Sequence, residues 1–118
     1  MVKNMAFVAY SVADVARSLA FYRDTIGLTV AQNFGDKWVE FDVGGTTFGI
    51  GNGSPIGAAP GSSQLTAAFE VDDVVAMRTR LKEHGVAVTD LHEGPSCTSC
   101  FVTDPDGNRF AIHQAKAA

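Results

Sequence analysis

Three side chains of this sequence are candidates for moving a proton in a catalytic step. Glu40, Glu70 and His113 each fall in an alternating, strand-like segment, on the face opposite its buried residues. A carboxylate in a partly apolar site can act as a base or bind a cation, and an imidazole can act as a general base or a polar contact. The alternatives are a solvated or Arg109-paired carboxylate for the glutamates and a surface histidine for His113. These three residues are the catalytic candidates.

The two cysteines have the C-x-x-C spacing of a redox or metal motif, as Cys97-Thr98-Ser99-Cys100. The segment continues into a strand-like run, in which a spacing of three places the two sulfurs on opposite faces. We therefore expect free thiols, with Cys97 on the open side and Cys100 in the core. A single thiol acting as a soft ligand for a metalloid is the alternative.

The run Asp104-Pro105-Asp106-Gly107-Asn108 has carboxylates at a spacing similar to that of calcium loops. Proline and glycine at these positions also favour a tight hairpin, in which acidic side chains accept hydrogen bonds from nearby backbone amides. The sequence favours the hairpin.

The elements that position these residues follow from periodicity. Residues 7–12 alternate as a strand, Asp14 stands at a helix N-cap, and Gly27 follows the last apolar residue of the helix. The predicted buried stripe of that helix is Val15, Leu19, Tyr22 and Ile26. Strands are predicted at 28–31, 38–43 and 46–50, with turns at Gly35-Asp36 and Gly44-Gly45.

The same pattern occurs twice. Residues 69–74 repeat the pattern of residues 10–15, with Asp73 as the second N-cap and Val74, Met77 and Leu81 as the second stripe. Residues 85–88 repeat 27–30, and a hairpin at Asp106-Gly107 leads into a last strand. The fold class is α+β: two βαβββ modules that form an open, curved mixed sheet with a concave cleft, because each helix covers only one face of its sheet. We expect one domain, 1–118, with modules at about 5–51 and 65–114 and a Gly/Pro/Ser-rich linker at 51–64.

Composition excludes several classes of partner. The chain has 118 residues, 46% apolar and 19% charged, with a formal net charge of −4 and no basic run. Nucleic acid is therefore not an expected partner. The sequence shows no apolar stretch long enough for a membrane span and no signal-peptide pattern, so we expect a cytoplasmic protein that does not bind membranes.

Three segments together resemble the vicinal oxygen chelate superfamily, which includes glyoxalase I, extradiol dioxygenases, fosfomycin-resistance transferases and bleomycin-resistance proteins. They are residues 12–28, with Arg17-Ser18-Leu19-Ala20-Phe21-Tyr22-Arg23-Asp24 inside them, residues 71–74, and residues 103–108. The resemblance covers nearly the whole chain and implies the fold rather than a particular chemistry. Members commonly form homodimers, often with exchanged strands or modules.

Metal-dependent members carry four ligands, and this chain has other residues at those places. The resemblance puts Phe7, Gly49, Thr66 and Ala111 at the four ligand positions. An aromatic ring, a glycine, a hydroxyl and an alanine do not make the imidazole and carboxylate set that such a cation needs. We therefore expect no metal and no cofactor.

The leading hypothesis is a small-molecule-binding protein of the bleomycin-resistance type that sequesters an aromatic or amphipathic compound. Trp38 shares a face with Glu40 and serves either as a platform for a flat ligand or as a lid on a subunit interface. The predicted pocket residues are Phe7, Trp38, Thr47, Thr66, Cys97, Phe101, Arg109 and His113. The alternatives are a lyase, isomerase or dioxygenase-type enzyme that uses a carboxylate, His113 or a relocated metal, and a scaffold with a vestigial cleft.

Overall fold

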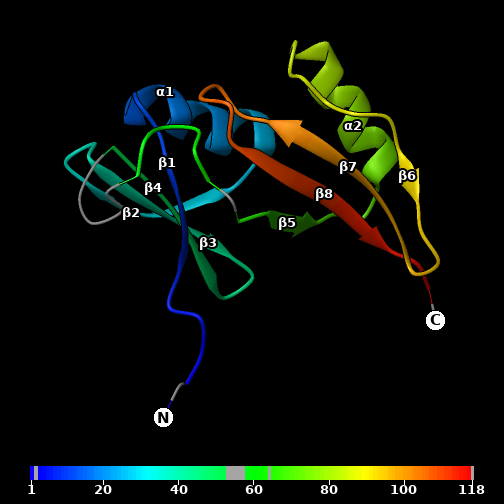
Figure 1. Ribbon diagram of the computed structural model, residues 1–118, viewed down its shortest axis with the longest axis horizontal. Helices are drawn as coiled ribbons and strands as arrows, with labels where there is room; N and C mark the ends of the chain where they lie inside the picture. The colour runs from blue at the N-terminus through cyan, green and yellow to red at the C-terminus, as the bar shows by residue number, and fades with distance from the viewer. Residues whose placement is uncertain (2, 53–57, 64, 118) are drawn as a thin grey trace. The chain divides into compact units, whose positions relative to one another are not determined.

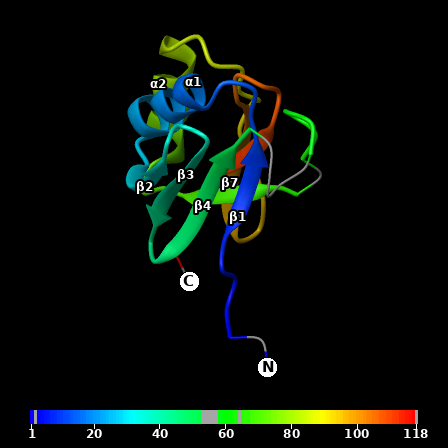
Figure 2. The same cartoon turned by 90° about the vertical axis from the view of Figure 1, so that its left-hand side faces the viewer.

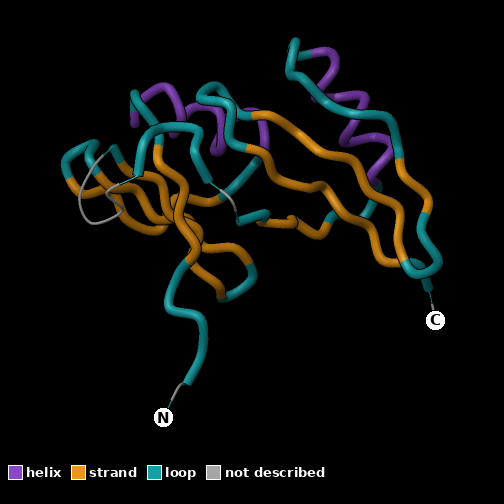
Figure 3. The backbone as a smooth tube through the Cα atoms, viewed as in Figure 1, coloured by secondary structure: helices purple, strands orange, loops and turns teal. Residues whose placement is uncertain are grey.

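A computed structural model describes residues 1, 3–52, 58–63 and 65–117. Its contacts divide the chain into two compact units, Met1–Ser63 and Gln64–Ala118. Of the predicted linker at 51–64, residues 53–57 and 64 lie outside the described residues. Figures 1 and 3 follow the chain through both units.

Unit 1 is a four-stranded mixed sheet with one helical segment. Its elements are β1 (Val8–Ser11), α1 (Val15–Ala20), η1 (Phe21–Ile26), β2 (Thr29–Phe34), β3 (Trp38–Val43) and β4 (Thr46–Gly51). The strand order is β1-β4-β3-β2, with β1 parallel to β4 and the other pairs antiparallel. Figure 2 shows these strands beside one another. Strand β3 has the predicted bounds, whereas β1 is shorter than predicted and β2 ends later.

The helical segment begins and ends at the predicted residues. The side chain of Asp14 caps α1 by accepting from the backbone N–H of Arg17, and Gly27 ends η1 with a φ of 93°. Its second half, η1, is a π-helix, a widened turn that the regular spacing does not predict. The prediction for Leu19 is wrong in part, because Leu19 is half-buried while Ser18 is fully buried.

Unit 2 repeats this topology. Its elements are β5 (Ala67–Glu70), α2 (Val74–Glu83), β6 (His92–Glu93), β7 (Cys97–Thr103) and β8 (Arg109–Ala115), in the sheet order β5-β8-β7-β6. Asp73 caps α2 by accepting from the N–H of Ala76, as predicted. Asp104 accepts from the N–H groups of Asp106 and Asn108, which confirms the predicted hairpin.

The repeat is imperfect where unit 2 should have its second strand. Residues 85–88 do not form a strand and make one isolated bridge, Val88 to Val102, and the strand that pairs with β7 is the two-residue β6. Between them, the hydroxyl of Thr89 accepts the N–H of Phe101 at 2.9 Å. A side chain that takes a backbone donor in this way interrupts the regular ladder.

Each unit has its own core between sheet and helix. Val39, Phe41 and Ile50 in unit 1 are fully buried, and the ring of Tyr22 in η1 lies 6.0 Å from that of Phe41. In unit 2, Cys100 and Ile112 are fully buried. We call the side of each sheet opposite these residues its open face.

Within the described residues, no helix is long and apolar enough to cross a membrane.

Candidate functional site

The open face of unit 1 carries a tryptophan that lies flat on two glycines. A Cβ added at Gly49 would stand 2.8 Å from two ring atoms of Trp38, and one added at Gly51 would stand 2.7 Å from a third. Gly51 is also the cross-strand partner of Trp38. One surface of the indole therefore covers the β4 backbone, and its other surface faces away from the sheet.

Two neighbours hold this indole in place. Its Nε1–H donates to Oε2 of Glu40 at 2.9 Å, and the ring of Phe7 meets it edge to face at 5.4 Å. Phe7 is 45% exposed, and Trp38 and Glu40 are half-buried. We call Phe7, Trp38 and the two glycines beneath the indole the aromatic shelf. Glu40, a catalytic candidate from the sequence, is the acceptor that orients the shelf.

The two threonines expected in the pocket lie at different places. Thr47 is half-buried on β4, two residues before Gly49 and on the same face. Thr66 is exposed and immediately precedes β5 in unit 2. A single pocket that contains the residues of both units stays a prediction.

The open face of unit 2 pairs the other two catalytic candidates. Glu70 on β5 is the register partner of His113 on β8, and its Oε1 lies 2.5 Å from Nδ1 of the ring. The second carboxylate oxygen accepts the backbone N–H of Ala115 at 2.7 Å. The Glu70 side chain is 57% exposed, so this carboxylate is both solvated and paired with His113.

These contacts settle the charge of Glu70. The N–H of Ala115 and the His113 ring both hold the pKa of its carboxyl below the usual value, with the backbone hydrogen bond as the larger cause. Glu70 is therefore ionised at neutral pH and can only accept hydrogen bonds. It follows that Nδ1 of His113 carries the proton in this contact.

Beside the pair, Ser99 and then His92 continue the row across the sheet. Ser99 on β7 is the cross-strand partner of His113, and His92 on β6 is the partner of Ser99. Cys97 lies on the same face, half-buried, while Cys100 is fully buried on the other. Both thiols are free and on opposite faces, as predicted, and burial raises the pKa of Cys100.

At the other end of β8, the predicted residues Arg109 and Phe101 come together. The guanidinium carbon of Arg109 lies 4.7 Å from the centre of the Phe101 ring, a cation–π contact on the open face. Phe101 is half-buried and Arg109 is exposed. This face therefore offers a cation and an aromatic ring at one end and an acid–imidazole pair at the other.

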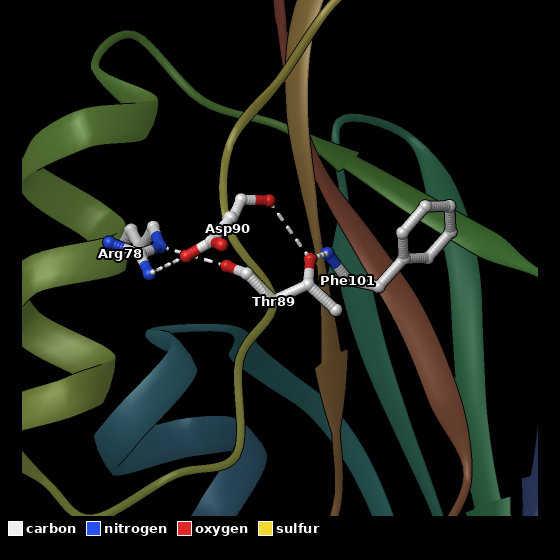
Figure 4. Close-up of polar contacts among 4 residues, drawn as sticks. All are labelled: Arg78, Thr89, Asp90 and Phe101. Atoms are coloured by element: carbon white, nitrogen blue, oxygen red, sulfur yellow. Dashed lines mark hydrogen bonds and ion pairs between the residues drawn. The ribbon is translucent and has the colours of Figure 1, made fainter.

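A set of polar contacts from α2 fixes the backbone of Phe101 (Figure 4). Arg78 donates to the carbonyl of Thr89 at 2.8 Å and to Asp90 at 3.1 Å. Thr89 accepts the N–H of Phe101 through its hydroxyl and donates its own N–H to the Phe101 carbonyl at 2.9 Å. The irregular segment before β6 is therefore tied to both α2 and β7.

The four positions that correspond to metal ligands in metal-dependent members do not fit a cation. The space that a side chain at Gly49 would need is filled by the Trp38 ring, Phe7 packs against that ring, and Ala111 has no donor atom. Only Thr66 offers an oxygen. Among the described residues, no three His, Cys, Asp or Glu side chains lie close enough together to hold a metal ion.

Sequence reasoning missed Gly51 as a member of the site, and it placed Ser99 on the face of Cys97 without pairing it with His113. Two glycines spaced by two on one strand face are a signal for a large side chain from the neighbouring strand, and Trp38 is that side chain. For Ser99, the signal is the register with His113, which depends on how the strands pair.

Comparison with known proteins relates this geometry to a family. Residues 4–112 match the model of the Glyoxalase/Bleomycin resistance protein/Dioxygenase superfamily. The chain is 26% identical to the metallothiol transferase FosB of Staphylococcus epidermidis, covering 96% of this chain and 84% of that protein.

Two solved structures from Streptomyces sp. CB03234 are similar over almost their whole length. TnmS3, described as an antibiotic binding protein, has 28% identity and a TM-score of 0.83, covering 98% of each chain. A glyoxalase/bleomycin resistance protein has 28% identity and a TM-score of 0.80, covering 94% of this chain and 100% of that one. With a family match over most of its length, this chain belongs to the glyoxalase/bleomycin resistance/dioxygenase superfamily, the group that its two βαβββ units resemble.

Proposed function

We propose that this protein binds a small aromatic or amphipathic molecule non-covalently and without a metal ion, and so sequesters it. The observation that carries the proposal is the aromatic shelf. An indole held flat by Glu40, with one surface against the sheet, presents its other surface to a planar ligand. TnmS3, described as an antibiotic binding protein, supports the same class of function.

The residues at the four metal-ligand positions favour non-covalent binding over a metal-dependent transfer reaction. FosB is a metallothiol transferase, but here a tryptophan ring occupies the space in front of Gly49. Elemental analysis of protein purified without chelator should find no stoichiometric nickel, zinc, manganese or iron. A metal bound at one equivalent would contradict this part of the proposal.

Trp38 also makes the binding measurable, because it is the only tryptophan in the chain. Bleomycin, tetracycline and other aromatic antibiotics are titrated while Trp38 fluorescence is recorded, with the non-aromatic fosfomycin as a comparison. A bound compound should quench the fluorescence and raise the unfolding temperature, because a ligand at 100 times its Kd adds about 2.7 kcal/mol to stability.

Substitutions distinguish specific binding at the aromatic shelf from non-specific hydrophobic binding. W38L and F7L should weaken binding of an aromatic hit as measured by thermal shift, whereas V75A, at an exposed position of α2, should leave it unchanged. Equal affinity of wild type and W38L for every hit, or no aromatic hit at all, would overturn the proposal.

A further inference from the structure

We propose that Nε2 of His113 is a proton acceptor for the ligand, so that the open face of unit 2 takes a molecule with an acidic hydroxyl, a phenol or an enol. This inference goes beyond the proposed function, which rests on the aromatic shelf of unit 1, and concerns the open face of unit 2 alone. The ligand O–H bond breaks, its proton moves to Nε2, and the oxyanion stays hydrogen-bonded to the new N–H.

The first support is the direction in which the ring is held. Glu70 contacts Nδ1 at 2.5 Å and is itself fixed by the N–H of Ala115 at 2.7 Å. Because an ionised carboxylate only accepts hydrogen bonds, the neutral ring carries its proton on Nδ1 and its lone pair on Nε2. This is the arrangement of an imidazole that is ready to accept a proton from a ligand.

The second support is that Nε2 remains available. Among the described residues, none makes a hydrogen bond with Nε2 of His113 or with the hydroxyl of Ser99 beside it. The side chain of His113 is 35% exposed. Its nearest neighbours along β8 on this face, Ala111 and Ala115, are small.

The third support is the charge around the ring. After proton transfer, the imidazolium is paired with the Glu70 carboxylate, which stabilises the charged form. The other titratable groups on this face are Cys97 on β7, His92 on β6 and Arg109 on β8. The Arg109 guanidinium is the cation of this face and would attract an oxyanion.

The test uses 4-nitrophenol, whose absorbance reports ionisation, and 4-nitroanisole, which has the same ring without the acidic proton. Bound nitrophenol should show the nitrophenolate spectrum at a pH where the free compound is mostly protonated. Nitroanisole should bind through its ring without a spectral change.

One substitution isolates Nε2. H113N keeps an N–H donor near the place of Nδ1, and with it the contact to Glu70, but removes Nε2. We expect H113N to weaken nitrophenol binding at least about tenfold, the usual effect of losing a hydrogen bond to a charged group, and to abolish ionisation, with nitroanisole binding unchanged. H84N, a histidine variant at the C-terminal end of α2, should behave as wild type.

The outcomes separate this inference from the proposed function. If nitroanisole binds but nitrophenol binds without ionising, the proton acceptor is wrong and aromatic binding stands. If nitrophenol ionises while nitroanisole does not bind, the proton acceptor stands and binding through the aromatic ring is wrong. If neither compound binds, the proposed function and this inference are both wrong. Nitrogen NMR of the ligand-free protein adds an independent check: a neutral His113 ring protonated at Nε2 would overturn the inference.

Discussion

At the scale of single residues, close contacts give small amino acids specific roles. Gly49 leaves the space that the Trp38 ring fills, and Ala115 contributes only a backbone N–H, yet that group is the larger cause of the lowered pKa of Glu70. Glu40 and Glu70 are both glutamates on open faces. One orients an indole and the other an imidazole, so their roles follow from their neighbours.

Substitution of Gly49 by alanine should displace the indole. The new Cβ would meet two ring atoms at 2.8 Å, and Trp38 is held by both Glu40 and Phe7. We expect a loss of about 1–3 kcal/mol in urea unfolding, the usual cost of overpacking, with altered Trp38 fluorescence. In a W38A background the same G49A change should cost much less. An equal cost in both backgrounds would mean that the clash is not the cause.

The Glu70 contacts also predict a pH dependence of stability. The pKa of Glu70 is lower in the folded protein than its ordinary value of 4.5, so ionised Glu70 stabilises the fold above that value. As the pH falls below about 4.5 toward the folded pKa, this contribution is lost. The stability difference between wild type and E70Q, from urea midpoints, should therefore shrink on acidification. A difference that does not change on acidification would contradict this role of the Glu70 contacts.

At the scale of elements, the sequence predicts what local signals determine. Asp14 and Asp73 cap their helices as expected, and the Gly44-Gly45 hairpin joins β3 and β4, because caps and tight turns depend on a few adjacent residues. The missing strand at 85–88 could not be predicted in this way. Next to it, the hydroxyl of Thr89 accepts the N–H of Phe101, a residue 12 positions away, and no local signal reveals such a contact.

Contacts between distant residues also limit what the sequence predicts about the candidate site. Alternation places Trp38, Glu40, Glu70 and His113 on open faces, but it does not say which of them touch. The Glu70–His113 contact depends on the register of β5 against β8, and the position of the indole depends on the packing of β3 on β4.

Replacing Thr89 by valine tests the importance of this contact. The variant leaves the N–H of Phe101 without its hydroxyl acceptor, which should cost about 1–2 kcal/mol in chemical unfolding. T79V is the matched control, because the hydroxyl of Thr79 donates to the carbonyl of Val75 within α2 at the surface. Equal effects of the two substitutions would contradict a special role for Thr89.

At the scale of the whole molecule, two units with the same topology carry different open faces. Unit 1 presents an aromatic shelf, and unit 2 presents an acid–imidazole pair with an arginine stacked on a phenylalanine. The two units therefore share a topology but differ in the side chains of their open faces. Assembly into a homodimer stays a prediction, which sedimentation equilibrium of the purified protein measures.

The single tryptophan tests whether the units unfold together, as one domain of 118 residues predicts. Trp38 lies in unit 1, whereas Asp73 caps α2 in unit 2. D73A should lower stability by about 1 kcal/mol, and in one cooperative domain the midpoint reported by Trp38 should shift by the same amount. D72A, next to the cap, is the control. An unchanged Trp38 midpoint in D73A would show that the units unfold separately.

The tryptophan above Gly49 also constrains the order in which this chain could change during evolution. A carboxylate introduced on β4 at position 49 would meet the indole at once, so the intermediate would carry a steric penalty before any ligand for a cation existed. A smaller residue at position 38 would remove this penalty, and it would also remove the aromatic surface. A metal ligand at position 49 and the aromatic surface of Trp38 therefore compete for the same space.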